Sequence, residues 1–127
     1  MASPSDIRQY EAQARSTDTF GRVLCSSRNH HFVVDGPVQN GCPGEEINPG
    51  ETFLSAVAAC GVELVQVLAR QQNVPLMAIS VSIKGFQDRG NPARSDFSVF
   101  NSVAMQFHLK GVSDEQATQL TEAFKRR

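Results

Sequence analysis

The fold of this chain is decided by the stretch Asn48-Pro49-Gly50-Glu51-Thr52-Phe53-Leu54-Ser55-Ala56-Val57-Ala58-Ala59-Cys60-Gly61-Val62-Glu63-Leu64-Val65. Apolar side chains occur at nearly every helical phase of this stretch, which predicts a helix over residues 50–72 that is buried on nearly all sides. A chain of 127 residues can hardly enclose such a helix alone, because small domains bury a limited fraction of their surface. We therefore expect a homodimer in which two copies share this helix.

The segments before the long helix predict a short helix, a hairpin and a loop. The start Ser3-Pro4-Ser5-Asp6 is typical of a helix N-terminus, and this helix would end near Arg15. Two strands are expected over residues 21–25 and 31–34, joined by a turn near Arg28. Residues 36–50 are rich in Gly and Pro and predict a loop of about 15 residues, a length that is often functional.

The segments after the long helix predict two more strands and a final helix. Residues 78–84 alternate between apolar and polar side chains, and residues 98–110 do the same. One-faced strands of this kind favour an antiparallel sheet with helices on the covered side. Ser113 then caps a helix that continues to Phe124. This order of elements is typical of an α+β fold, with an N-terminal helical extension at residues 1–18 and the main domain at 19–127.

Composition and charge exclude several classes of protein. Apolar residues make up 40% and charged residues 20%, as in a soluble globular domain. The net charge of −1 gives no reason to expect a nucleic-acid or membrane partner. We find neither a secretory signal nor a run of about 18 apolar residues that would span a membrane. The odd number of widely spaced cysteines, Cys25, Cys42 and Cys60, favours a reducing, cytoplasmic location.

Several motifs, in this order, resemble the OsmC/Ohr family of small dimeric peroxide-detoxifying proteins over roughly residues 20–127. They are Phe32-Val33-Val34-Asp35-Gly36-Pro37, Asn48-Pro49-Gly50-Glu51, the helix at 54–70 with Cys60 inside it, Asn73-Val74-Pro75-Leu76, the strand at 79–83 and the junction Leu109-Lys110-Gly111-Val112-Ser113-Asp114-Glu115. The resemblance implies antiparallel sheets packed around long central helices in an intertwined homodimer. It also implies a thiol peroxidase active in the oxidative stress response.

In that family the cysteine of the long helix attacks a peroxide oxygen, becomes a sulfenic acid and forms a disulfide with a second cysteine. Cys60 matches the attacking cysteine. An Arg and a Glu hold the thiolate in the family, and the positions expected for them carry Thr19 and Gly50 here. The family's second cysteine and final strand follow the last helix, whereas this sequence ends at Arg127.

The nearest available substitutes define the candidate site. A thiolate at Cys60 needs a cation from elsewhere, because the helix dipole acts only within the first turn. Arg22 or Arg28 on the hairpin would supply it. Glu51 would orient that Arg or simply favour the helix N-terminus. The candidate catalytic residues are therefore Cys60, Glu51 and Arg22. No flavin, haem or nicotinamide motif occurs, so we expect no cofactor and an external dithiol as the electron donor.

Other interpretations of these residues stay open. Cys60 could pack as a small hydrophobe, in which case the dimer would bind a small apolar ligand without catalysis. A thiol redox sensor would need the loop residue Cys42, otherwise an exposed loop cysteine, to lie close to Cys60. Cys25 is expected to be packed. A metal site formed by Cys25, His30, His31 and Cys42 fits no common zinc spacing, so we expect no metal.

Overall fold

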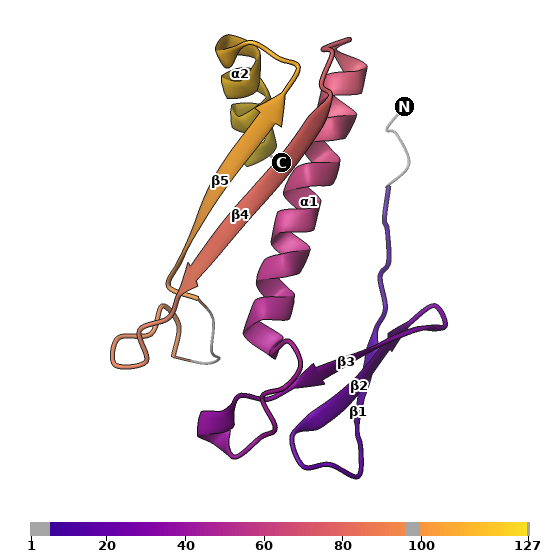
Figure 1. The fold of residues 1–127 in the computed structure, drawn as a ribbon, viewed down its shortest axis with the longest axis vertical. Coiled ribbons are helices and arrows are strands. Elements are labelled where there is room, and N and C mark those ends of the chain that lie inside the picture. Colours follow the sequence, from indigo (N-terminus) through magenta and orange to yellow (C-terminus); the bar gives the residue numbers. More distant parts are fainter. Residues whose placement is uncertain (1–5, 96–99, 127) are drawn as a thin grey trace. The chain divides into compact units, whose positions relative to one another are not determined.

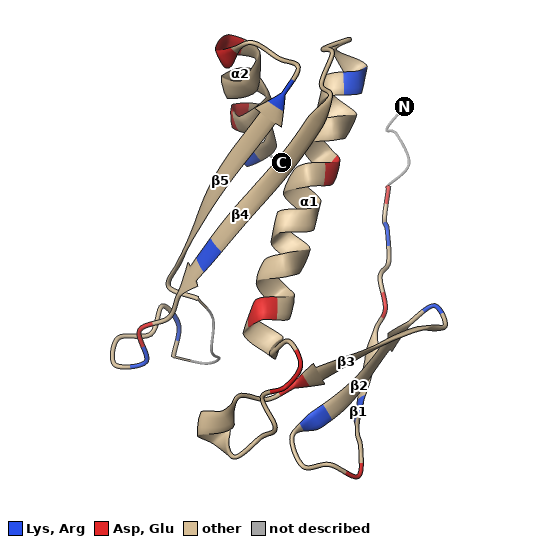
Figure 2. Cartoon of the chain, in the orientation of Figure 1, with Lys and Arg blue, Asp and Glu red and all other residues tan. Residues whose placement is uncertain are grey.

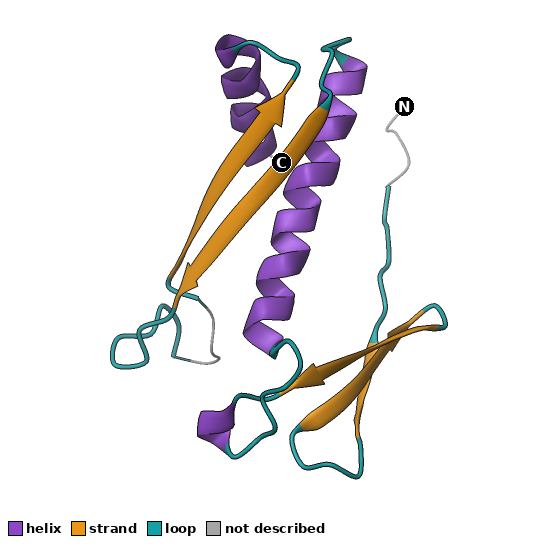
Figure 3. Cartoon of the chain, in the orientation of Figure 1, coloured by secondary structure: helices purple, strands orange, loops and turns teal. Residues whose placement is uncertain are grey.

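The structure is a computed structural model that describes residues 6–95 and 100–126. The chain divides into two compact units, residues 1–52 and residues 53–127, and each is described by itself. Figure 1 shows the helices and strands, and Figure 3 colours them by type. The described elements are helices and antiparallel strands, as the α+β prediction requires.

The first unit contains an antiparallel sheet in the order β1-β2-β3, with β1 at Gln13–Ser16, β2 at Arg22–Ser27 and β3 at His30–Asp35. The turn between β2 and β3 consists of Arg28 and Asn29, whose φ angles are 49° and 66°. Two residues with positive φ are the usual connection of a two-residue hairpin, so the predicted hairpin is confirmed. The loop that follows contains a short 3-10 helix, η1, at Val38–Asn40.

The predicted N-terminal helix is wrong for the residues that the structure describes. Residues 6–12 form neither helix nor strand, and residues 13–16 form β1, which pairs with β2. The segment has few apolar side chains to bury, and Ile7 and Tyr10 are largely exposed. A helix of this length gains stability mainly by burying an apolar face. This segment lacks such a face, so residues 13–16 pair with the edge of β2 as a strand instead of forming a helix. The predicted cap, Ser3 to Asp6, lies mostly outside the described residues.

The second unit contains most of α1 (Pro49–Gln71), the antiparallel pair β4 (Ala78–Phe86) and β5 (Ser102–Lys110), and α2 (Asp114–Lys125). The predicted alternation is confirmed over β4, where Ile79, Val81 and Ile83 are half-buried and the residues between them are exposed. On β5 it holds only from Met105 onward, because Val103, expected to face inward, is exposed. The core joins both helices, with Val65 and Leu120 almost completely buried. The rings of Phe107 on β5 and Phe124 on α2 pack with centroids 5.5 Å apart.

Within a single chain α1 is covered on one side only. Its buried residues are Gly61, Val65, Leu68 and Ala69, whereas Phe53 and Val67 remain exposed. Burial on nearly all sides is therefore not achieved by one copy. Figure 2 shows how few charged residues the helix carries. By length and composition α1 could cross a membrane, contrary to the sequence expectation, although the central helix of a soluble protein can have the same properties.

Candidate active site

Cys60 is exposed on α1, and its neighbour Gly61 explains why. A Cβ atom added at Gly61 would lie 3.3 Å from Met105 Cε and from the ring of Phe107, which is closer than most real contacts. Gly61 thus lets α1 approach β5 closely. Since successive helical side chains point about 100° apart, this packing turns the Cys60 thiol away from β5. The thiol is exposed in the single chain, rather than packed as a core residue.

The thiol belongs to an exposed stripe along α1. Phe53, Ala56, Cys60, Glu63 and Val67 follow one another at spacings of three and four residues, and all five are exposed. Side chains with this spacing share one face of an α-helix. The surroundings of the sulfur on that face are therefore apolar and small toward Phe53, with a carboxylate one turn away at Glu63.

Glu51 forms a capping box at the N-terminus of α1. The Glu51 N–H donates to Asn48 Oδ1 at 2.8 Å, and the Asn48 N–H donates to Glu51 Oε1 at 3.0 Å. A carboxylate in the first turn also favours the positive end of the helix dipole. These contacts give Glu51 a structural role at the helix N-terminus, which is one of the two roles expected for it from the sequence. Its role beside an arginine stays a prediction.

Arg22 on β2 is held by two carboxylates in the first unit. Its Nε donates to Asp35 Oδ1 at 2.8 Å and its Nη2 to Asp35 Oδ2 at 2.9 Å, and Nη2 also donates to Glu45 Oε1 at 3.2 Å. Asp35 is completely buried, whereas Glu45 is largely exposed. Arg22 belongs to the first unit and Cys60 to the second, so a pairing of the two stays a prediction.

Asp35 is the centre of a cluster that the sequence interpretation missed as a site. Besides Arg22, the backbone N–H groups of Glu45 and Glu46 donate to Asp35 Oδ2, both at 3.0 Å. These hydrogen bonds, that from Arg22 most of all, hold the pKa of Asp35 well below its usual range and outweigh the opposite effect of burial. In return, Asp35 raises the pKa of Arg22. The cluster ties residues 45 and 46 of the loop to the end of the hairpin.

Cys42 is half-buried against two glycines of the first unit. A Cβ atom placed on Gly21 or on Gly36 would overlap the Cys42 sulfur. The thiol also lies 3.8 Å from the Asn40 carbonyl oxygen, a weak hydrogen bond. The expectation of an ordinary exposed loop cysteine is therefore wrong, because the missing side chains of two glycines make room for the sulfur.

Comparison with known proteins identifies the family. The family model described as OsmC-like protein matches residues 42–127, a range that contains Cys42, Glu51 and Cys60. The chain belongs to the OsmC-like family. No curated protein matches this OsmC-like sequence.

Solved structures similar to this OsmC-like protein share its fold. An OsmC-like protein from Mycoplasma pneumoniae has a TM-score of 0.79 at 14% identity, over 94% of this chain and 82% of that one. An organic hydroperoxide resistance protein OsmC from Legionella pneumophila has a TM-score of 0.73 at 19% identity, over 96% and 85% of the two chains. The organic hydroperoxide resistance protein OhrB of Bacillus subtilis has a TM-score of 0.62 at 21% identity, over 94% and 84%. Among structures of this fold are therefore proteins of organic hydroperoxide resistance.

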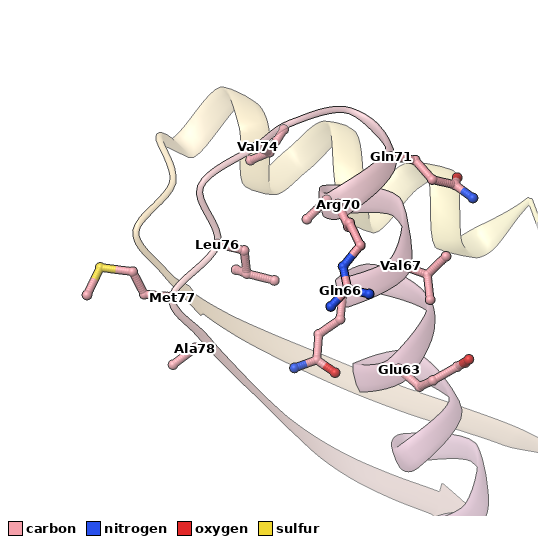
Figure 4. A pocket seen from close by; sticks show the side chains of 10 residues that line it. Glu63, Gln66, Val67, Arg70, Gln71, Val74, Leu76, Met77 and Ala78 are labelled. Carbon is pink, nitrogen blue, oxygen red and sulfur yellow. The ribbon is translucent and has the colours of Figure 1, made fainter.

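The OsmC-like chain also has an open pocket of about 510 Å³ near the C-terminal end of α1. Its lining includes Glu63 and Arg70 from α1 and the apolar residues Leu76 and Met77 from the segment leading into β4, as Figure 4 shows. Cys60 does not line it. Across residues 6–95 and 100–126, no group of three or more His, Cys, Asp or Glu side chains could hold a metal ion.

Proposed function

We propose that this OsmC-like protein reduces organic hydroperoxides, with the Cys60 thiol as the attacking group. The observation that carries the proposal is an exposed thiol on a largely apolar face of α1, in a chain of this family. Several proteins of similar structure are named for organic hydroperoxide resistance, which supports a peroxide as the oxidant. A cytoplasmic role in the oxidative stress response belongs to the same proposal.

The proposed reaction begins with the Cys60 thiolate, which is the nucleophilic form of the side chain. Its sulfur attacks the terminal oxygen of the hydroperoxide ROOH, the O–O bond breaks and the leaving alkoxide takes up a proton to give ROH. Cys60 becomes a sulfenic acid, with the sulfur oxidised and the peroxide reduced by two electrons. An external dithiol then returns the two electrons, which regenerates the thiol and releases one water and a disulfide.

Arg22 is the proposed cation for the thiolate, and Glu51 its proposed orienting partner. A guanidinium has five N–H donors, and Nε and Nη2 of Arg22 are engaged by Asp35 and Glu45. The Nη1 atom has no partner among the described residues and is the donor that we assign to the sulfur. Asp35 and Glu45 would then fix the guanidinium in position at the cost of part of its charge.

The uncovered face of α1 supports the homodimer as part of this proposal. Phe53 is 55% exposed and Val67 is 37% exposed in the single chain. Contiguous exposed apolar surface on a soluble protein commonly marks a contact with a partner, and a second copy of α1 would cover it. Sedimentation analysis should therefore show a dimer at micromolar concentration.

A second function is favoured by the two carboxylates on Arg22. If they neutralise the cation fully, Cys60 is not activated, and the protein is a dimer that binds a small apolar ligand without turnover. The thiol-sensor alternative has less support, because the Cys42 sulfur is seated between Gly21 and Gly36.

The deciding experiment follows Cys60 alone in a Cys25→Ala, Cys42→Ala background. We expect the Cys60 thiol to be alkylated in the folded protein, because it is exposed. We also expect one cumene hydroperoxide to be consumed per Cys60. Cys60→Ser in the same background is the control and should consume none. A thiol that reacts only after unfolding, with no loss of peroxide, would leave the ligand-binding function.

A further inference from the structure

The two carboxylates that bind Arg22 differ in how firmly they hold it. Asp35 is completely buried and accepts two hydrogen bonds, from Nε at 2.8 Å and from Nη2 at 2.9 Å. The Glu45 side chain is 75% exposed and accepts one hydrogen bond, from Nη2 at 3.2 Å. A bidentate pair fixes the plane of a guanidinium, whereas an exposed ion pair is weak. Asp35 therefore supplies most of the positioning of Arg22.

The Glu45 carboxylate is not needed to hold its own loop. The backbone N–H groups of Glu45 and Glu46 donate to Asp35 Oδ2, and the Asp35 N–H donates to the Ile47 carbonyl oxygen at 3.1 Å. These bonds use main-chain atoms of the loop, so a different side chain at position 45 leaves them in place. Within the described ranges, the Glu45 side chain bonds to Arg22 alone. What the carboxylate changes is therefore the charge around that guanidinium.

Glu45 lies on the edge of the guanidinium that the proposed function uses. Nη2 carries two N–H groups in a planar, rigid fork. One of them is used by Asp35 on the Nε side, so Glu45 takes the other, on the edge that Nη2 shares with Nη1. Asp35 already balances the charge of Arg22, and Glu45 makes the group negative overall. A negative charge beside a thiolate disfavours it, whereas a cation favours it.

We infer that Glu45 is an autoinhibitory contact, whose carboxylate on Arg22 opposes stabilisation of the Cys60 thiolate. This inference rests on the proposed function and adds its regulation. Release of the Glu45 side chain leaves the guanidinium bound to Asp35. It also frees the second N–H of Nη2, next to Nη1, to donate to the thiolate. Loss of an acidic side chain therefore strengthens the site, whereas loss of Asp35 would weaken it.

Glu46 provides a matched control. It is the next residue in the loop, it is exposed, and its backbone N–H makes the same bond to Asp35 at 3.0 Å as that of Glu45. In the part of the chain that the structure describes, its side chain forms no ion pair with Arg22. Glu45→Gln and Glu46→Gln thus remove the same charge at neighbouring positions, and only the first removes the contact.

The test measures the rate of Cys60 alkylation by iodoacetamide at about pH 7 in the full chain, with the product at Cys60 quantified by peptide mass spectrometry. Glu45→Gln should react about threefold to fivefold faster than the wild type, which is the change in rate that corresponds to an exposed ion pair. Glu46→Gln should react at close to the wild-type rate. Equal rates in the two variants would overturn the inference.

A second background shows whether Glu45 acts through Arg22. The double change Arg22→Gln, Asp35→Asn removes the cation together with its buried partner, so that neither charge is left unpaired. In this background Glu45→Gln should accelerate alkylation no more than Glu46→Gln does. An acceleration that persists there would overturn the inference. So would one that accompanies a lower urea midpoint than that of Glu46→Gln, because it would report an opened loop.

Consumption of cumene hydroperoxide separates this inference from the proposed function. If Glu45→Gln is faster than Glu46→Gln in both alkylation and peroxide consumption, both proposals are supported. If alkylation is faster but neither the wild type nor the variant consumes peroxide, the autoinhibitory contact is confirmed and the peroxidase function is wrong. If the wild type consumes peroxide and the two variants do not differ in either assay, the peroxidase function stands and the autoinhibitory contact is wrong.

Discussion

Replacement of Leu120 by alanine should destabilise the second unit by about 3 kcal/mol. Leu120 is 1% exposed and packs with Val65, Leu68 and Ala69 in the buried core between the two helices. The change removes three carbon atoms, worth about 0.8 kcal/mol each by transfer from water. A cavity adds to this loss, and buried Leu→Ala changes cost roughly 2–5 kcal/mol in all.

Urea denaturation at a fixed protomer concentration measures this loss, because dimer formation would make apparent stability depend on concentration. With a slope of about 1.5 kcal/mol per molar urea, the midpoint should fall by roughly 2 M. Thr118→Ala on the same helix is the control. Its exposed hydroxyl donates to the Asp114 carbonyl oxygen at 3.0 Å, and its loss should change stability by less than about 0.5 kcal/mol. A loss below about 1 kcal/mol for Leu120→Ala would refute the assignment of this core.

Three further changes test other parts of the structure. Gly61→Leu should cost about 1–3 kcal/mol by overpacking against Met105, and a urea midpoint equal to the wild type would contradict the close approach of α1 to β5. Ser113→Ala removes the cap of α2 and should cost about 1 kcal/mol in the same assay, so an unchanged midpoint would count against the capping box. The pKa of Asp35 is lower in the folded protein than in the unfolded chain, where it is about 3.9. The ionised carboxylate therefore stabilises the fold at pH values above about 3.9, and this stabilisation is lost as the pH falls below that value. Asp35→Asn should remove this part of the acid sensitivity in a pH titration of unfolding, and an identical acid transition would show that the Arg22 pair contributes none of it.

The sequence predicted the elements whose signals are local. The alternation of Ile79, Val81 and Ile83 indicates a one-faced strand wherever the strand lies, and Ser113 marks a helix start without reference to distant residues. The prediction of an N-terminal helix was wrong. The helix-start motif Ser3-Pro4-Ser5-Asp6 is also a local signal, but the residues that follow it have too few apolar side chains to form a buried helix face. There the open edge of β2 decided the outcome, and an edge cannot be recognised from residues 3–15 alone.

The cluster around Asp35 shows how much of the candidate site can be predicted from the sequence. The two-residue turn at Arg28 and Asn29 places Ser27 opposite His30, and the same register places Arg22 opposite Asp35. That half of the cluster could have been predicted from the hairpin. The N–H groups of Glu45 and Glu46 could not, because they reach Asp35 through the fold of a long loop. The exposure of Cys60 could not be predicted either, because it depends on which face of α1 packs against β5 in the tertiary structure.

The packing of the Cys42 side chain against Gly21 and Gly36 should make the residues at these three positions depend on one another in related sequences. Gly36 has no positive φ that would require glycine, so it is the Cys42 side chain, both its sulfur and its Cβ, that forbids a side chain there. A homologue can therefore gain an alanine at position 36 if position 42 loses its whole side chain by becoming glycine. Gly21 is restricted twice, by the sulfur and by its φ of 81°, and should change far less often. Covariation between positions 36 and 42, with position 21 nearly constant, is the record that this packing would leave in related sequences.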